Sequence, residues 1–267
     1  MNVSSSDNLT EKPARLTLEQ VRDDLGECRR CELCETRTTI VFGVGNPHAE
    51  VMFIGEAPGK QEDLGAEPFI GAAGKYLNSL LSIAGLKREE IYIANVLKCR
   101  PPSNRDPQPA EIEICTPFLR DQVRAINPLV LVTLGRFSTQ FILKTDVGIS
   151  NLRGRVHLTG RFSVLPIFHP AAALYDPSKG PVMEKDFELL GALITKRREE
   201  CAARRNQVVS GRDGKDIEQA VPEDDQQAAP EDNQQAAPEN NQQVMPENNP
   251  QAARETAQQT IFEEHAE

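Results

Sequence analysis

Short apolar runs alternate along the chain with longer segments in which apolar residues recur every three or four positions. We expect the short runs to form buried strands, at residues 51–54, 91–96, 129–134 and 164–168. Unbroken apolar runs are typical of parallel strands that helices cover on both faces. The pattern therefore predicts an α/β protein: a three-layer α/β/α sandwich with a mainly parallel four-stranded sheet, beside which residues 39–44 form a short edge strand.

The periodic segments predict the helices that cover this sheet. We expect these helices near residues 16–28, 75–85, 109–126, 137–143 and 183–198. Several of the connecting stretches are rich in glycine, proline or arginine and are expected to be loops, because proline fixes φ and removes a backbone donor. These loops are residues 55–74, 98–107 and 152–155.

The composition changes after Arg205. Residues 222–253 are four copies of one polar octad, rich in Pro, Gln and Asn, with almost nothing to bury. We therefore expect a disordered acidic tail over residues 206–267, a disordered N-terminus over residues 1–13, and one folded domain over residues 14–205. The tail is assigned no chemistry, and a protein partner that binds it is left open.

The net charge of −10 originates in this tail. Residues 206–267 carry 14 acidic and 3 basic side chains, a net of −11, whereas the rest of the chain carries a net of +1. The acidity is therefore no argument against a polyanionic partner for the folded domain. Because the sequence has neither an apolar run of about 20 residues nor a secretory signal, it predicts a cytoplasmic protein without a membrane partner.

Most of the cysteines lie in two separate segments. Cys28, Cys31 and Cys34 follow the first expected helix, whereas Cys99 lies in a proline-rich loop and Cys115 in the next helix. In a chain without an export signal, clustered thiols are more often metal ligands or catalysts than disulfides. Two cysteines from each segment suit a tetrahedral zinc ion or an iron–sulfur cluster equally well, and the spacing leaves open which two of the first three bind.

Polar and aromatic residues follow the expected strands at their carboxyl ends, where an open α/β sheet usually binds its ligand. The loop 55–74 holds Phe69, which is either a staple into the core or a platform for a flat ligand. Asn95 ends the second strand, and its amide offers both a donor and an acceptor, as reading the edge of a base requires. His169 follows the fourth strand, where it either caps the strand or donates a hydrogen bond to a developing oxyanion.

These residues belong to a series of motifs that runs in order from about Cys28 to Leu190. The motifs are Gly55-Glu56-Ala57-Pro58-Gly59, Glu62-Asp63, Pro68-Phe69, Asn95, Lys98-Cys99-Arg100-Pro101-Pro102, Asn104-Arg105, Leu134-Gly135 and His169-Pro170. In type and spacing they resemble the bacterial and archaeal family-4 uracil-DNA glycosylases. The resemblance implies the uracil-DNA glycosylase fold and a [4Fe-4S] cluster. It places the cluster ligands at Cys28, Cys31, Cys99 and Cys115, with zinc as the minor alternative and Cys34 unused.

The resemblance also implies how the site acts on a uracil that has been flipped out of DNA. Phe69 is expected to stack on the base. Asn95 is expected to bind the N3–H and O4 edge of the base, while the backbone N–H of Ala57 serves a uracil oxygen. His169 is expected to stabilise the departing uracil anion at O2.

The remaining roles concern water and DNA. Glu56 is expected to orient or activate the attacking water, with help from Glu62 and Asn104. DNA contacts are expected from basic loops and from an apolar side chain that wedges into the gap left by the flipped base. These DNA-contacting residues are Arg100, Arg105, Arg153 and Leu174.

The predicted function is a uracil-DNA glycosylase that acts as a monomer on single- or double-stranded uracil-containing DNA. It hydrolyses the N-glycosidic bond, releases uracil and leaves an abasic site. One alternative is a protein that traps uracil-DNA covalently through a histidine, but residues 104–107 run on without the extra His-containing loop of such relatives. The other is a non-catalytic iron–sulfur DNA-binding module.

Overall fold

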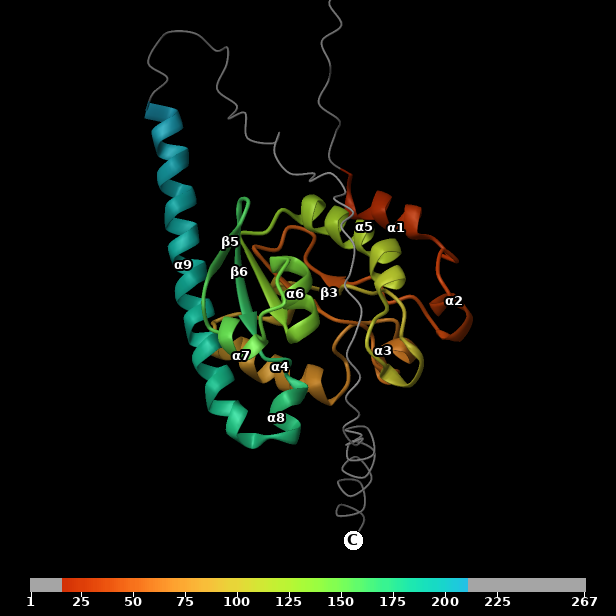
Figure 1. Cartoon of the computed structure of the whole chain (residues 1–267). Coiled ribbons are helices and arrows are strands. Elements are labelled where there is room, and N and C mark those ends of the chain that lie inside the picture. The colour runs from red at the N-terminus through yellow and green to blue at the C-terminus, as the bar shows by residue number, and fades with distance from the viewer. Residues whose placement is uncertain (1–15, 211–267) are drawn as a thin grey trace, which may run out of the picture. The chain divides into compact units, whose positions relative to one another are not determined.

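The computed structural model of the chain describes residues 16–210, with the backbone alone for 206–210. In this part of the chain, six strands form one sheet in the order β1-β3-β2-β4-β6-β5 (Figure 1). The strands are β1 (Val44–Gly45), β2 (Val51–Gly55), β3 (Tyr92–Asn95), β4 (Val130–Leu134), β5 (His157–Thr159) and β6 (Phe162–Ile167). The predictions for residues 1–13 and for the octad repeats lie outside the described residues.

The four predicted core strands are confirmed, and they run parallel in the order β3-β2-β4-β6. The predicted sheet was nevertheless too small, because the antiparallel strands β1 and β5 make it a mixed sheet of six strands. Of the predicted edge strand at 39–44, only Val44 lies in a strand, because β1 consists of Val44 and Gly45. β5 was missed because it is short and largely exposed, with Leu158 78% exposed, so it has no apolar run.

Helices occupy most of the connections between strands. The α-helices are α1 (Leu18–Leu25), α2 (Leu33–Thr36), α3 (Lys60–Gly65), α4 (Ala72–Ile83), α5 (Pro109–Ile126), α6 (Arg136–Leu143), α7 (Ile149–Leu152), α8 (Ala171–Tyr175) and α9 (Gly180–Ser210). The long predicted helices are confirmed, whereas α3 lies inside a predicted loop. α9 continues to Ser210, beyond its expected end near residue 198 and into the segment expected as tail. No helix within residues 16–210 is both long and apolar enough to cross a bilayer.

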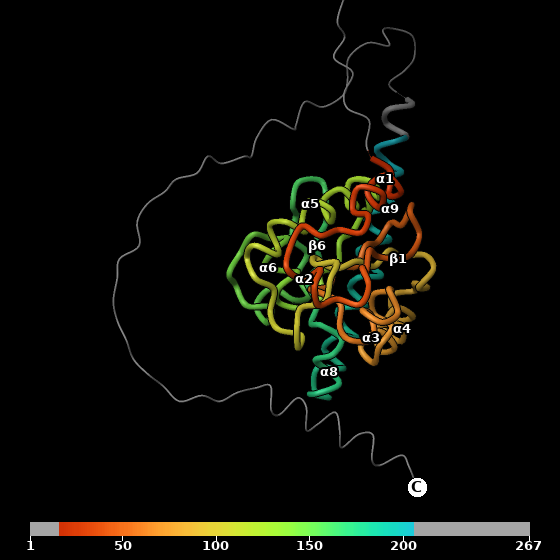
Figure 2. Tube along the Cα trace, turned by 90° about the vertical axis from the view of Figure 1, so that its right-hand side faces the viewer, coloured from red at the N-terminus to blue at the C-terminus, as the bar shows by residue number. Residues whose placement is uncertain are grey.

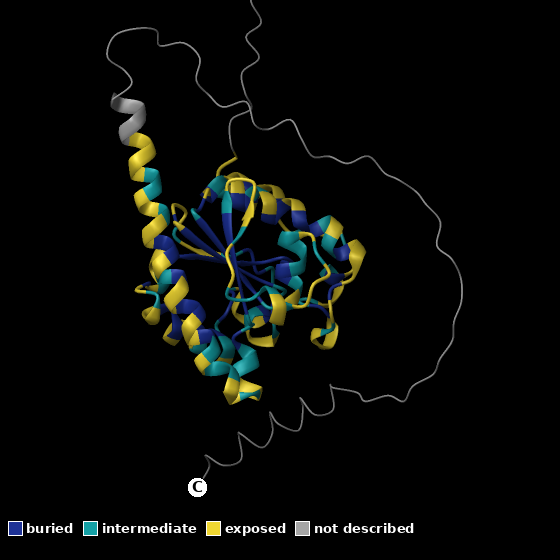
Figure 3. Cartoon of the chain, turned by 60° about the vertical axis from the view of Figure 1, so that its left-hand side comes forward, coloured by how far each residue is buried: buried dark blue, intermediate teal, exposed yellow. Residues whose placement is uncertain are grey.

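Two apolar clusters, one on each face of the sheet, explain the layered arrangement. Side chains alternate across a strand, so Phe53 of β2 faces α4 and α9 while its neighbours Met52 and Ile54 face α5. Figure 3 shows the buried strands between helices whose outer faces are exposed. The three-layer α/β/α arrangement thus agrees with the apolar pattern, and α1 packs against α5 on the outside of one layer.

α9 runs antiparallel to the neighbouring core strands. Gly180, at its start, lies near Tyr76 of α4, whereas Arg198 forms an ion pair with Glu50, which directly precedes β2. The two views in Figures 1 and 2 accordingly put α3 and α8 at one end of the sheet and the end of α9 at the other. The carboxyl ends of the parallel strands meet at the edge where α9 begins.

Phe187 anchors α9 to the sheet. Its ring stacks on that of Phe53 with a centroid distance of 6.1 Å, and both side chains are fully buried. We expect Phe187→Ala to lower the free energy of unfolding by about 3–5 kcal/mol, since it leaves a cavity in the core. Leu189→Ala, at a 36% exposed position of the same helix, should change it by less than about 1 kcal/mol. Urea denaturation measures both, and equal losses would contradict this anchoring role.

Candidate active site at the carboxyl edge of the sheet

Phe69, Asn95 and His169 meet at the carboxyl ends of β2, β3 and β6. The rings of Phe69 and His169 lie 5.4 Å apart between centroids, at an interplanar angle of 32°. Gly55 pairs with Asn95 in the sheet, and its missing side chain lets Phe69 and Asn95 come close. A Cβ at Gly55 would lie 2.3 Å from Asn95 Oδ1 and 2.8 Å from Phe69 Cε2, so only glycine leaves this space open.

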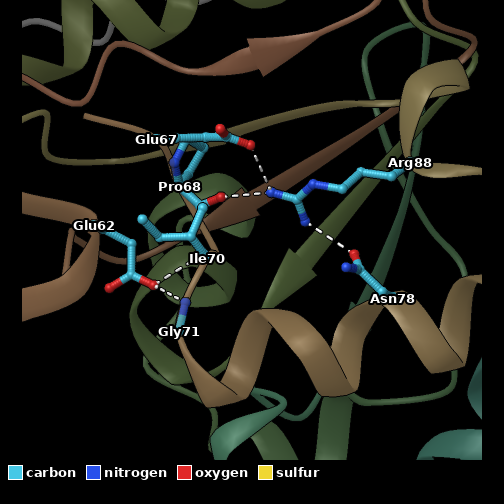
Figure 4. Close-up of polar contacts among 7 residues, drawn as sticks. All are labelled: Glu62, Glu67, Pro68, Ile70, Gly71, Asn78 and Arg88. Atoms are coloured by element: carbon cyan, nitrogen blue, oxygen red, sulfur yellow. Dashed lines mark hydrogen bonds and ion pairs between the residues drawn. The ribbon is translucent and has the colours of Figure 1, made fainter. Parts of the chain in front are cut away.

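The loop that carries Phe69 is held by side-chain hydrogen bonds. Glu62 of α3 accepts at Oε1 from the backbone N–H groups of Ile70 (3.1 Å) and Gly71 (3.0 Å) (Figure 4). Gly74 is required as well, because a Cβ there would lie 1.7 Å from the carbonyl oxygen of Phe69. Phe69 itself is buried and has a φ of 55°, in the left-handed region that aromatic residues rarely adopt.

Asn95 presents an unsatisfied acceptor. Its side chain is 2% exposed, and Oδ1 is buried without a hydrogen-bond partner. The backbone of Asn95 is held by Lys98, whose Nζ donates to the Asn95 carbonyl (2.8 Å) and to Gln122 Oε1 (2.6 Å). Since an unpaired buried acceptor costs about 1–3 kcal/mol, the amide is suited to a ligand that brings a donor.

His169 is held as a neutral donor. Its Nδ1 accepts from the backbone N–H of Ala171 (3.2 Å), so in the neutral ring the proton lies on Nε2. Burial lowers the pKa of His169 from 6.5 to about 4, an effect that the negative charge of Glu62 partly opposes. Gly135 gives the ring its room, since a Cβ there would lie 3.1 Å from His169 Cβ.

The other residues predicted for water and base binding lie in the segments that follow β2 and β3. Glu56 and Ala57 follow β2 directly and are half-buried. Asp63 is buried and accepts from the backbone N–H groups of Thr38 and Thr39, which gives it a structural role. Asn104 is exposed on the 3₁₀ helix η2 (Pro102–Asn104), and its Oδ1 accepts from Arg100 Nε (2.8 Å).

Two of the arginines predicted to bind DNA have buried carboxylate partners. Arg105 forms a two-pronged pair with Glu111, and Arg153 forms one with Asp186 of α9. These contacts brace loops against helices, so a DNA contact by either guanidinium stays a prediction. Leu174, on α8, is 44% exposed, as an apolar wedge must be.

The predicted cysteine ligands lie in three segments: Cys28 and Cys31 between α1 and α2, Cys99 in the loop after β3, and Cys115 in α5. Cys99 and Cys115 are buried in one apolar cluster with Leu33 and Leu97, and Cys31 packs against that cluster. Cys28, just after α1, packs against a neighbouring cluster. Ala57 also packs against the cluster of Cys99, which puts the cysteine region beside the loop that follows β2.

Several donors point at the cysteine sulfurs. The backbone N–H of Lys98 donates to Cys115 Sγ and the Arg37 guanidinium to Cys99 Sγ, each at 3.3 Å. Burial raises the pKa of Cys99 to about 11 and raises those of Cys31 and Cys115, and neighbouring thiolate charge raises each of them further. Within residues 16–210, however, no three His, Cys, Asp or Glu side chains form a group that could hold a metal ion.

Comparison with known proteins decides the family. The family model of the Uracil DNA glycosylase superfamily matches residues 42–192, more than half of the chain. This chain belongs to the uracil DNA glycosylase superfamily.

Three curated members of this superfamily illustrate the similarity. A Type-4 uracil-DNA glycosylase of Archaeoglobus fulgidus is 47% identical over 189 residues, which span 68% of this chain and 95% of that protein. The Type-4 enzyme of Sulfurisphaera tokodaii is 43% identical, over 68% of this chain and 87% of its own length. The corresponding protein of Thermotoga maritima is 41% identical, over 60% of this chain and 85% of its own length.

The superfamily match contains Phe69, Asn95 and His169, but it begins after Cys28 and Cys31. No role was predicted for Lys98 or Arg88, although Lys98 holds the backbone of Asn95 and Arg88 donates to the carbonyl oxygen of Pro68. Lys98 is fully buried, and burial lowers its pKa to about 8 against the opposing charges of Cys115 and Cys99. A lysine directly after an apolar strand was the available signal for Lys98, whereas Arg88 lies in an ordinary polar stretch.

The pair between Arg105 and Glu111 predicts a pH-dependent stability. Hydrogen bonding from Arg105 lowers the pKa of Glu111 below its usual 4.5, so the unfolded chain takes up this proton at a higher pH than the folded one. The stabilisation is therefore present above a pH of about 4.5, and it is lost as the pH falls through the lower pKa that Glu111 has in the folded state.

We expect Glu111→Gln to lower the free energy of unfolding by about 1–3 kcal/mol at neutral pH, with the gap to wild type narrowing below pH 4.5. Denaturant unfolding at several pH values measures the gap. Glu113→Gln, at an exposed position of the same helix, is the control. A gap independent of pH would contradict the assignment.

Proposed function

We propose that this chain is a uracil-DNA glycosylase that flips uracil out of DNA and hydrolyses its N-glycosidic bond, which releases uracil and leaves an abasic site for base excision repair. The observation that carries the proposal is the unpartnered buried Oδ1 of Asn95 beside the ring of Phe69, which in turn lies against the ring of His169. The similarity to Type-4 uracil-DNA glycosylases, which extends over most of the length of those proteins, supports the same substrate.

Recognition depends on a ring and an amide. Phe69 stacks on the extruded base, an interaction worth about 1–3 kcal/mol when an aromatic side chain stacks on a base. Asn95 Oδ1 accepts from uracil N3–H, and its amide N–H donates to O4. Cytosine has an acceptor at N3 and an amino group at C4, so it would place like groups opposite one another. The backbone N–H of Ala57 serves a further uracil oxygen.

Bond cleavage depends on the neutral imidazole. As the glycosidic bond breaks, the sugar becomes oxocarbenium-like and uracil leaves as an anion with charge at O2. His169 donates its Nε2–H to that oxygen, a stabilisation that strengthens as the charge develops. With a pKa near 4, the ring is uncharged at neutral pH and acts as a hydrogen-bond donor. Because the imidazole is already neutral, it can donate this hydrogen bond without first gaining or losing a proton.

Glu56 is the candidate for orienting the attacking water. Glu62 contributes mainly to the loop, since its Oε1 already binds two backbone N–H groups. Asn104 assists from η2. On the DNA side, Leu174 wedges into the gap in the base stack, and Arg100 with the two paired arginines lines the approach to the phosphates.

We further propose that Cys28, Cys31, Cys99 and Cys115 hold a [4Fe-4S] cluster. A single zinc ion would need its four sulfurs around one point at about 2.3 Å, whereas a four-iron cluster takes each thiolate on a different iron and so accepts wider spacing. Buried thiols with N–H donors aimed at sulfur fit such a group. When bound, the cluster would supply a structural cross-link between the segment after α1 and the segments of β3 and α5.

A uracil-release assay tests the activity. Wild-type protein should release uracil from single- and double-stranded oligonucleotides, and His169→Ser should lower the single-turnover rate by about tenfold or more while the fold is retained. His48→Ser, at an exposed position, is the control. Between pH 8 and 5.5 the wild-type rate should show no step near 6.5, because the pKa of His169 lies near 4. A stable protein–DNA adduct, or binding without free uracil, would refute the proposal.

The cluster proposal has a spectroscopic test. Anaerobically purified protein should absorb in the visible range and contain iron and acid-labile sulfide, and Cys99→Ser should lose both signals. Cys34→Ser should retain them, since Cys34 is not among the proposed ligands. Zinc in place of iron, or equal losses in both variants, would overturn the assignment.

A further inference from the structure

The backbone at Phe69 is held in a conformation that it would not adopt by itself. A φ of 55° is unfavourable for an aromatic residue, and such conformations persist only where neighbouring groups determine them. Two peptide planes flank this residue. The orientation of the plane between residues 68 and 69 sets φ, and that of the plane between residues 69 and 70 sets ψ.

Each of these planes is held by one charged side chain (Figure 4). Glu62 binds the N–H of Ile70, which belongs to the second plane (3.1 Å). Arg88 binds the first plane, because its Nη2 donates to the carbonyl oxygen of Pro68 at 2.7 Å. The two charged groups therefore fix φ and ψ of Phe69 from opposite sides.

Arg88 is itself well placed to act as a support. It begins the 3₁₀ helix η1 (Arg88–Glu90), which lies between α4 and β3, and its side chain is 24% exposed. Its Nη1 donates to Asn78 Oδ1 of α4 at 3.0 Å, so the guanidinium ties the Phe69 loop to a helix of the core. Its ion pair with Glu67 is longer, at 3.4 Å, and partly exposed, so it contributes little.

We infer that Arg88 is a positioning residue for uracil excision. Its bond to the Pro68 carbonyl keeps the Phe69 ring where the extruded base must stack, beside Asn95 and His169. The inference rests on the proposed function, and it adds a residue that touches neither base nor sugar. The route from Arg88 to the reaction passes through Phe69 alone.

That single route limits the size of the effect. Removing an aromatic platform that contributes about 1–3 kcal/mol lowers the rate roughly 5- to 150-fold. A residue that acts only through Phe69 cannot lower the rate by more than the loss of Phe69 itself. We therefore expect Arg88→Met to lower it by roughly 3- to 30-fold, between wild type and Phe69→Ala.

A double-mutant cycle tests the route. Single-turnover uracil release is measured for wild type, Arg88→Met, Phe69→Ala and the double variant. Arg88→Met should lower the single-turnover rate in the wild-type background, whereas in the Phe69→Ala background it should change the rate by no more than about twofold. A merely structural role would give the same factor in both backgrounds. Equal factors, an unchanged rate in Arg88→Met, or a loss larger than that of Phe69→Ala would overturn the inference.

Two further variants serve as controls. Arg124→Met removes an exposed, ion-paired arginine of α5 and should leave the rate unchanged. Glu67→Gln removes the weak ion pair but leaves the carbonyl contact, so it should stay within about twofold of wild type, and a loss as large as that of Arg88→Met would contradict the role of the carbonyl.

Folding is checked by circular dichroism. If Arg88→Met does not fold, Arg88→Lys, which keeps one charged donor, takes its place in the same cycle. Wild-type protein that releases no uracil would refute the proposed function itself. If the wild-type protein is active and the effects of the two substitutions on the rate simply multiply, only the role of Arg88 is refuted.

Discussion

The close approach of Phe69 and Asn95 across Gly55 is the contact on which the site depends. Parallel pairing sets Gly55 directly opposite Asn95, and a methyl group at residue 55 would lie 2.3 Å from the amide oxygen. Because β3 and β6 end at the same edge as β2, the sheet brings the amide and the imidazole together, whereas the ring of Phe69 is placed by the loop that Glu62 and Arg88 hold. The site therefore depends both on the register of the sheet and on the hydrogen bonds of this loop.

The site also holds three groups in states that are unfavourable by themselves. Asn95 buries an acceptor without a partner, His169 loses the proton it would keep in water near pH 6, and Phe69 adopts a left-handed backbone. Two of these residues are held in place by their surroundings, since Lys98 binds the Asn95 carbonyl and Glu62 binds the loop of Phe69. The large cores on both sheet faces make such local destabilisation tolerable.

Sequence reasoning could predict the four core strands and place Phe69, Asn95 and His169 at one edge, because apolar runs mark strands and parallel strands share their carboxyl edge. It missed β5, which has no apolar run. It also predicted Arg105 and Arg153 only as DNA contacts, because no apolar pattern marks their buried partners. Glu111 lies six residues from Arg105, on the first turn of α5, and Asp186 lies 33 residues from Arg153. Ion pairs between different elements have no periodic signature, so the structure was needed to find them.

The direction of α9 has a practical consequence. The helix starts at the edge that carries the site, passes the Arg198–Glu50 pair at the opposite edge, and extends roughly 18 Å further to Ser210 at about 1.5 Å per residue. A fluorophore, fusion domain or surface tether joined at Ser210 would therefore begin well away from the DNA-reading side. Immobilised protein of this design should keep its substrate approach clear, which suits single-molecule work on long DNA.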